Sequence, residues 1–246
     1  MRLIVIGSSS AGNSYVLEND RESLLIECGV RFQKIKVALN FKLSKVVGCL
    51  ITHEHKDHCL AVNEVMAAGI NVYSAAGTLK AMGVEGNHRA KKINLDTTFT
   101  IGGFRIRSFD VQHDCAEPVG FLIHHEETGN VLFLTDSYYV AYTFPNLHNI
   151  IVEANYSQEI LDDRLRRGDS PEFLRNRVLN SHMSLKTCKE LLQANDLRET
   201  NNIVLIHLSD SNSNADQFKR EVSNLTGKQV HIAEPGLIIS FDKQPF

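Results

Sequence analysis

The sequence predicts an α/β protein in which two β-sheets pack face to face with helices outside. Strand-like runs occur in both halves of the chain, helix-like periodic segments accompany each half, and turn residues separate them at short intervals. No repeat or low-complexity tract appears, and the five prolines and fifteen glycines are spread as turn punctuation instead of gathering in a linker. We therefore expect a single domain over residues 1–246.

Short apolar runs and the turn residues between them place the individual elements. Runs rich in β-branched residues are typical of strands, and apolar residues three or four apart predict helices. Strands are expected at residues 3–6, 14–18, 23–27, 46–51, 71–74, 98–101, 104–111, 120–125, 131–134, 150–152, 203–206, 230–232 and 237–241. Helices are expected at residues 31–40, around 60–67, and at 76–82, 185–194 and 215–225.

Composition excludes several classes of protein. The net charge of −3 argues against a basic surface that coats nucleic acid without selectivity. The five cysteines are scattered and never form CxxC, so we expect free buried thiols and neither a disulfide framework nor a thiolate zinc site. No secretory leader is recognisable, and no apolar run approaches the roughly 20 residues of a membrane span. We expect a cytoplasmic protein without membrane contact.

The hexapeptide HEHKDH, residues 53–58, follows the predicted buried strand at 46–51. His53 and His55 lie two residues apart, so an extended or looping backbone brings them to one cation while Asp57 and His58 turn toward another. Imidazole and carboxylate are ligands that zinc, manganese and iron accept. A charged surface turn is the competing interpretation, but it rarely needs three histidines.

Metal-capable residues recur at the ends of later strands, at His113, Asp136 and His207. With HEHKDH, in this order and strand context, they make the chain resemble the metallo-β-lactamase fold, whose motif HxHxDH ends a buried strand. The resemblance implies a four-layer αββα sandwich and two divalent metal ions, zinc or manganese, with iron also compatible. It assigns His53, His55 and His113 to one ion, Asp57, His58 and His207 to the other, and Asp136 to both.

The paired ions would lower the pKa of a shared water and so yield a bridging hydroxide near neutral pH. Glu54 and Lys56 have no assigned metal, and we expect both to point away. In the family, the third strand usually ends in an aspartate that supports the metal loop, whereas this chain has Glu27 there. We expect the longer side chain to orient a metal ligand through hydrogen bonds. A surface carboxylate is the alternative.

Further segments resemble the YycJ-like (WalJ-like) subgroup of this family. They are GSSSAGNS at residues 7–14, EANY at 153–156, SHMS at 181–184 and HLS at 207–209. The subgroup is viewed as DNA-directed, with 5′ to 3′ exonuclease activity as the usual assignment. The resemblance implies Asp57 and His182 as catalytic residues. His182 would donate a proton to the leaving oxygen or hold the scissile phosphate, and a neighbour of a helix cap is the alternative role.

Candidate substrate contacts come from the Gly/Ser loop and from an arginine-bearing stretch. Backbone N–H groups and hydroxyls of such a loop can cradle a phosphate, and arginine forks suit phosphates. A tight turn and a solvated helix face are the competing interpretations. The expected contacts are Ser8, Ser9, Ser10, Asn13, Asn155, Arg167 and Arg177.

The leading hypothesis is therefore a metal-dependent phosphodiesterase, a 5′ to 3′ exonuclease on DNA, in which a metal-bridged hydroxide attacks a backbone phosphate. A second hypothesis keeps the metals but changes the substrate to a small cyclic or diester phosphate or a lactone. The third is a non-enzymatic, metal-binding regulatory protein. An intact set of seven candidate ligands argues against the third.

Overall fold

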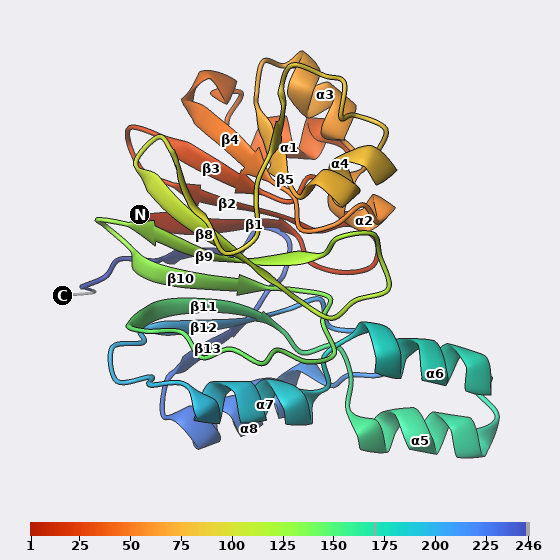
Figure 1. Cartoon of the computed structure of the whole chain (residues 1–246). Coiled ribbons are helices and arrows are strands. Elements are labelled where there is room, and N and C mark those ends of the chain that lie inside the picture. Colours follow the sequence, from red (N-terminus) through yellow and green to blue (C-terminus); the bar gives the residue numbers. More distant parts are fainter. Residues whose placement is uncertain (170, 245–246) are drawn as a thin grey trace.

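The computed structural model describes residues 1–169 and 171–244, and the strands of this part form two seven-stranded sheets (Figure 1). In spatial order the first sheet contains β14 (Ile238–Ser240), β1 (Arg2–Gly7), β2 (Ser14–Glu18), β3 (Ser23–Ile26), β4 (Val46–Leu50), β5 (Val72–Ser74) and β6 (Ala90–Lys92). The second contains β13 (Gln229–Ile232), β12 (Asn202–Ile206), β11 (Leu147–Glu153), β10 (Gly129–Leu134), β9 (Val119–His125), β8 (Phe104–Asp110) and β7 (Thr98–Ile101).

Both sheets are mixed, and their pairing sets the direction of the strands that matter for the site. In the first sheet β1, β2 and β3 are antiparallel hairpin neighbours, whereas β3 to β6 pair in parallel. In the second, β8, β9 and β10 alternate in direction, whereas β10 to β13 are parallel. Strands β8, β10, β11 and β12 therefore run in the same direction and end at one edge of their sheet.

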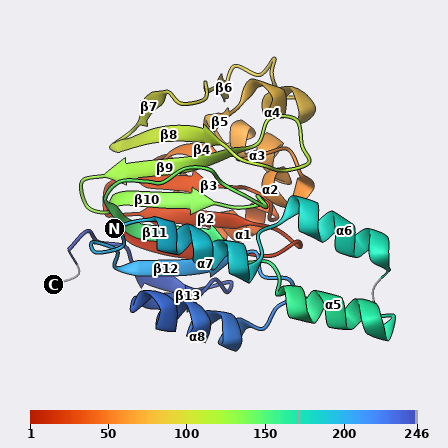
Figure 2. The same ribbon diagram turned by 60° about the horizontal axis from the view of Figure 1, so that its bottom comes forward.

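Helices cover the outer faces of both sheets. On the first sheet lie α1 (Phe32–Ala38), α3 (Val62–Ala67) and α4 (Ala76–Ala81), and on the second lie α7 (Leu185–Ala194) and α8 (Ala215–Thr226). A four-residue helix, α2 (Lys56–Cys59), lies inside the hexapeptide, and a 3₁₀ turn covers Leu43–Lys45. Two further helices, α5 (Gln158–Arg167) and α6 (Glu172–Ser181), project from the body as a hairpin (Figure 2).

Apolar side chains on alternate faces of the strands hold the four layers together. Leu3 and Val5 of β1 belong to the core between the sheets, where they join Phe121 and Phe133 of the second sheet. Ile4 of the same strand faces the layer of α1, α3 and α4. Because successive side chains of a strand point to opposite faces, one strand supplies both cores. The predicted four-layer αββα sandwich is confirmed, while the prediction of a single domain over 1–246 stays a prediction.

The bounds predicted for β2, β7 and α7 agree with the structure, but several elements were not expected. Strand β6 and helices α2, α5 and α6 are additional. The buried residues of α5 and α6 are Leu161 and Ser181, and this stretch was noted in the sequence for its arginines and not for an apolar pattern. Strand β11 begins three residues earlier than expected because its polar residues His148 and Asn149 are buried. Within the described residues, no helix is both long and apolar enough to cross a membrane.

Candidate metal centre

The candidate residues meet where strands of both sheets end. Glu27 follows β3, the hexapeptide follows β4, and Asp136 and His207 follow β10 and β12. Glu27, Asp136 and His207 have φ angles of 61°, 46° and 53°, in the left-handed region that non-glycine residues rarely adopt. Such strained residues persist where the surrounding structure holds them, and they cluster at functional sites. Here these three residues turn the backbone sharply just after strands β3, β10 and β12 end.

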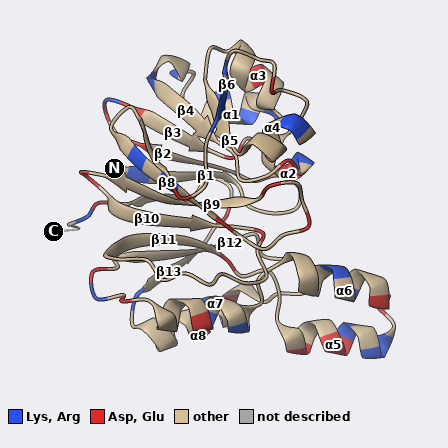
Figure 3. Cartoon of the chain, in the orientation of Figure 1, with Lys and Arg blue, Asp and Glu red and all other residues tan. Residues whose placement is uncertain are grey.

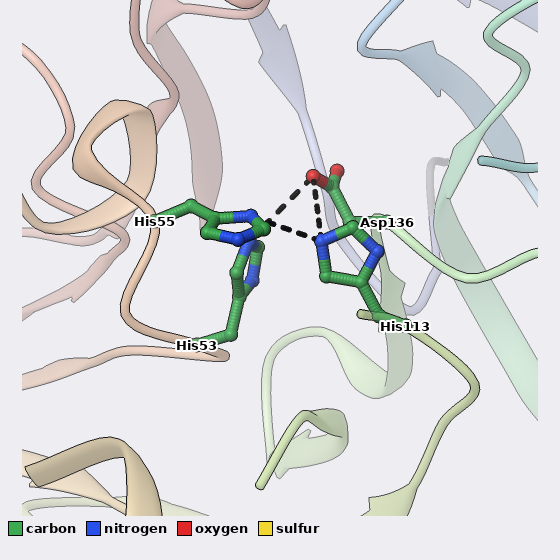
Figure 4. A group of neighbouring side chains, drawn as sticks. All are labelled: His53, His55, His113 and Asp136. Carbon is green, nitrogen blue, oxygen red and sulfur yellow. Dashed lines mark hydrogen bonds and ion pairs between the residues drawn. The ribbon is translucent and has the colours of Figure 1, made fainter. Parts of the chain in front are cut away.

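The first group of possible ligands contains His53, His55, His113 and Asp136 (Figure 4). Their ligand atoms all lie within 4.8 Å of one another. Nε2 of His53 is 3.7 Å and Nε2 of His113 is 3.8 Å from Oδ2 of Asp136, and Nε2 of His113 is 3.1 Å from Nδ1 of His55. The structure thus brings together the residues that the resemblance assigned to one ion.

The second group contains Asp57, His58, His207 and again Asp136. Nε2 of His58 is 3.3 Å from Oδ2 of Asp136 and 3.4 Å from Oδ2 of Asp57. The same Asp57 oxygen is 3.4 Å from Nε2 of His207. Asp136 therefore has one carboxylate oxygen near ring nitrogens of both groups.

The chemistry of these side chains fits a divalent cation. Nε2 of His53 is buried and has no hydrogen-bond partner among the described residues, and burial lowers the pKa of this ring, which keeps it in the neutral form that binds metals. Burial alone would raise the pKa of Asp136, but the charges of His207 and His58 hold it well below its usual range. Burial would lower the pKa of His207, yet the carboxylates of Asp136, Asp57 and Glu153 raise it to about 10. The centre thus attracts positive charge, which a cation supplies.

Hydrogen bonds from outside the two groups orient the rings. Nδ1 of His113 donates to the carbonyl oxygen of Ser181, at 2.8 Å, which turns Nε2 toward Asp136. Ser181 is the last residue of α6, so the projecting hairpin reaches the centre at its base. His53 is held through Nδ1, which lies 2.9 Å from Oγ1 of Thr52. Such outer contacts fix the tautomer and the direction of a ligand.

Glu27 is fully buried, so the alternative of a surface carboxylate is wrong. Its Oε1 accepts hydrogen bonds from the backbone N–H of Thr52, at 3.1 Å, and from the hydroxyl of Thr52, at 2.5 Å. The same oxygen lies 3.6 Å from Nδ1 of His58. Burial raises the pKa of the Glu27 carboxyl above its usual value. The side chain thus connects the start of the metal loop with a candidate ligand, although its role as an orienter stays a prediction.

The backbone of the hexapeptide rests on the segments before β2 and after β3. The N–H of Asn13 donates to the carbonyl of Asp57 at 2.7 Å, and the N–H of Cys28 donates to the carbonyl of His58 at 2.9 Å. Nδ2 of Asn13 lies 3.1 Å from Nε2 of His58. Lys56 is exposed, and that it points away from the centre stays a prediction. Glu54 accepts the N–H of Ala116 at 2.8 Å and so holds the loop that follows His113.

A third group, not predicted as a whole, contains Glu153 and His182 together with Asp136 and His207. Oε1 of the fully buried Glu153 lies 2.7 Å from Nδ1 of His182, and its Oε2 accepts the N–H of Met183 at 3.0 Å. Burial alone would lower the pKa of His182, but the charge and hydrogen bond of Glu153 raise it. The His182 ring stacks on that of His207 with centroids 5.2 Å apart.

Glu153 was missed as a site residue because a carboxylate inside an apolar strand carries no spacing signal. The EANY segment was noted for its resemblance alone. The sequence feature that could have identified Glu153 is its position at the end of a strand, which it shares with Asp136.

The predicted substrate contacts are dispersed around the centre. Oγ of Ser8 accepts the N–H of His207 at 3.0 Å, and Nδ2 of Asn155 donates to the carbonyl of His207 at 2.7 Å. Ser9 accepts the N–H of Ala11 within the loop, and Ser10 is exposed. Ser8, Asn13 and Asn155 therefore bond to candidate ligands in this structure, and their contact with substrate stays a prediction.

Arg167 and Arg177 lie on the projecting hairpin, which carries both basic and acidic residues (Figure 3). Arg167 is exposed and pairs with Asp163 of its own helix at 2.5 Å, and Arg177 is exposed. The structure does not bring either guanidinium into contact with the described residues of the centre. Their contact with substrate also stays a prediction.

Comparisons with known proteins agree with this geometry. A family model described as a β-lactamase superfamily domain matches residues 23–208. Exodeoxyribonuclease WalJ of Streptococcus pneumoniae is 31% identical over 225 residues, which cover 85% of this chain and 82% of that protein. Exodeoxyribonuclease YycJ of Bacillus anthracis is 26% identical over 239 residues, or 90% and 87% of the two chains. The crystal structure of the metallo-β-lactamase fold protein YhfI from Bacillus subtilis has a TM-score of 0.75 at 18% identity and covers 97% and 98% of the two chains.

Proposed function

This chain belongs to the β-lactamase superfamily, and we propose that it is a metal-dependent exonuclease that hydrolyses the phosphodiester bonds of DNA from the 5′ end. The observation that carries the proposal is the pair of ligand groups that share Asp136. The two relatives named exodeoxyribonucleases, each aligned over most of this chain, support DNA as the substrate.

The proposed centre holds two divalent ions, zinc or manganese, with iron also compatible. His53, His55 and His113 would hold one ion, Asp57, His58 and His207 would hold the other, and Asp136 would contact both. Nitrogen and oxygen ligands suit all three metals, so their supply decides occupancy. Bound divalent ions lower the pKa of water and offset the negative charge that develops on phosphate oxygens.

Glu153 and His182 supply the proton in this proposal. The Glu153 carboxylate accepts the Nδ1 proton of His182 at 2.7 Å, which leaves Nε2 as the atom that exchanges a proton with substrate. The His182 ring lies beside two candidate ligands, with centroids 5.9 Å from that of His113 and 5.2 Å from that of His207. Its side chain is 21% exposed, so it can be reached from outside. We assign it the donation of a proton to the leaving 3′ oxygen.

The Gly/Ser loop and the hairpin complete the proposed substrate contacts. Ser8, Ser9, Ser10, Asn13 and Asn155 would surround the reacting phosphate, and Arg167 and Arg177 would meet the strand further along. Phosphate contacts position a nucleic acid without reading its sequence, so this set predicts little sequence preference.

An assay on 5′-phosphorylated DNA tests the proposal. The purified protein, stripped of metal and then supplied with zinc or manganese, should release nucleotides from single- or double-stranded DNA, and Asp57→Ala should not. Lys56→Ala is the matched control, because Lys56 lies beside Asp57 in the sequence but is exposed. Absence of metal-dependent nucleotide release from every DNA tested, with turnover of lactones or small phosphodiesters instead, would contradict the proposal.

A further inference from the structure

We infer that Tyr15 is a positioning residue for one of the two proposed ions. The ion assigned to His53, His55 and His113 is the first ion, and the ion assigned to Asp57, His58 and His207 is the second. The hydroxyl of Tyr15 holds Ser8 and Asn13, and these three residues, the Tyr15 network, support the second ion alone. The inference rests on the proposed function, from which it takes the two ions, and adds a support that is independent of substrate contact.

Tyr15 carries a polar group into an apolar core. The residue belongs to β2, is fully buried between the sheets, and packs edge-on against Phe133 of β10 with ring centroids 5.5 Å apart. Phenylalanine would fill nearly the same space, and a buried hydroxyl is unfavourable unless it is hydrogen-bonded. Burial raises the pKa of Tyr15 above its usual value, so the hydroxyl keeps its proton and can donate. The partners of this hydroxyl therefore indicate what it does.

The Tyr15 hydroxyl bonds to two residues of the Gly/Ser loop. It donates to Oγ of Ser8 at 2.8 Å, and Oδ1 of Asn13 lies 3.3 Å away as a second acceptor. Because an amide carries its oxygen and its NH₂ group on opposite sides, an oxygen held by Tyr15 leaves the NH₂ group facing the other way. Tyr15 thus selects which end of the Asn13 amide faces the candidate ligands.

Asn13 presents its NH₂ group to the metal loop. Its Nδ2 lies 3.3 Å from the carbonyl oxygen and 3.4 Å from Oδ2 of Asp57, and 3.1 Å from Nε2 of His58. The reverse orientation would place the amide oxygen against the two oxygens of Asp57, and oxygen acceptors cannot hydrogen-bond to one another. The orientation that Tyr15 favours is therefore the one that supports Asp57.

Ser8 holds the remaining residue of the second group. Its Oγ accepts the backbone N–H of His207 at 3.0 Å. His207 is buried and has a left-handed φ of 53°, so this N–H needs an acceptor, and the bond helps to keep the backbone in a conformation that non-glycine residues rarely adopt. The ring that this backbone carries has Nε2 3.4 Å from Oδ2 of Asp57. The two branches of the Tyr15 network therefore meet at Asp57 and His207.

Different residues support the first ion. Within the part of the chain that the structure describes, the Tyr15 network makes no hydrogen bond to the three histidines of the first group. Those rings are oriented by Thr52, beside Nδ1 of His53, and by the carbonyl of Ser181, which accepts from His113. The supports of the two ions are thus separate, and removal of one should leave the other in place.

Calorimetric titration of the metal-free protein with zinc tests the inference without substrate. The wild type should bind two ions. Tyr15→Phe keeps the ring and should weaken the second ion about 10-fold, and Ser8→Ala should weaken it roughly 10- to 100-fold, the usual effect of losing an outer-shell partner of a ligand. Neither variant should change the affinity of the first ion. Tyr73→Phe is the matched control, because Tyr73 packs on the same core but its hydroxyl bonds to no described residue.

Ligand variants identify which ion is affected. His113→Ala should retain the second ion alone, and Asp57→Ala should retain the first ion alone. Tyr15→Phe should lower the zinc affinity of the His113→Ala protein by the same factor as in the wild type, and it should not change the zinc affinity of the Asp57→Ala protein. The comparison separates the two ions because non-additive effects report a shared network.

Equal weakening of both ions by Tyr15→Phe, or of neither, would overturn the inference and leave the nuclease proposal intact. A metal-free Tyr15→Phe protein that melts well below metal-free Tyr73→Phe would also overturn it, since the hydroxyl would then serve folding in general. A wild-type protein that binds two ions but releases no nucleotide from DNA would instead refute the proposed function and leave the inference standing. A wild-type protein that binds fewer than two ions would overturn both.

Discussion

Gly29 lies so close to Asp57 that a β-carbon on Gly29 would sit 1.6 Å from the Asp57 carbonyl oxygen. This contact accompanies the two backbone hydrogen bonds that seat the hexapeptide on the segments containing Asn13 and Cys28. Because the atom that the β-carbon would meet is a backbone carbonyl oxygen, it cannot move aside as the end of a flexible side chain could. The position of the metal loop, residues 53–58, therefore requires that residue 29 have no side chain.

Gly29→Ala should displace the metal loop. Forced overpacking against backbone costs about 3 kcal/mol, which for a chain of this size lowers Tm by roughly 6 to 12 °C. Metal content after purification should fall as well, because Asp57 and His58 move together. Thermal melts and elemental analysis measure the two effects. Gly86→Ala is the control, since nothing lies within 4 Å of a β-carbon there, and equal behaviour of the two variants would contradict the prediction.

Glu27→Ala should weaken metal binding as well as folding. The substitution leaves the buried N–H of Thr52 without its acceptor, which costs about 1–3 kcal/mol, and loss of such an outer-shell group typically costs 10- to 100-fold in metal affinity. Titration calorimetry with zinc and denaturant unfolding give the two numbers. Glu27→Gln keeps one acceptor oxygen and should lose less of both, and a metal affinity equal to that of wild type in Glu27→Ala would exclude an orienting role.

His182→Ala should separate proton transfer from metal binding. We expect kcat to fall by about 10²- to 10⁴-fold, the usual contribution of a general acid, with metal content unchanged. Asp136→Asn should instead lose metal, since Asp136 belongs to both ligand groups. Elemental analysis beside steady-state kinetics distinguishes them. His182 also belongs to the third group of possible ligands, so the alternative role is metal binding. A His182→Ala protein that lacks metal would show that His182 is a ligand.

Lys56→Ala and Glu54→Ala should differ from each other. Lys56 is exposed, so its removal should change stability by less than about 0.5 kcal/mol and leave activity near that of wild type. Glu54 holds the N–H of Ala116, so its removal should loosen the loop after His113 and lower activity moderately. Both should retain far more activity than Asp57→Ala. Nucleotide release at saturating metal measures this order, and an inactive Lys56→Ala protein would contradict it.

The sequence was most informative where chemistry and strand pattern coincide. HEHKDH directly after an apolar run, with His113, Asp136 and His207 at later strand ends, carried the family resemblance, and that resemblance implied which residues meet. The bonds that hold them could not be predicted. Ser181 contributes a backbone carbonyl, which every residue has, and Glu153 is a buried carboxylate with no local spacing rule. Helices α5 and α6 were not predicted because each buries only one residue and their many charged residues drew attention to possible phosphate contacts.

The carbonyl of Ser181 has a mechanical consequence. Ser181 is the last residue of α6, and its carbonyl fixes the ring of His113. The Ser181 hydroxyl donates to Asp114 at 2.8 Å, so one residue is bonded to a candidate ligand and to the residue that follows it. The base of the hairpin is therefore bonded directly to a candidate metal ligand. Any displacement of the hairpin that moved Ser181 would change the direction in which His113 offers its second ring nitrogen.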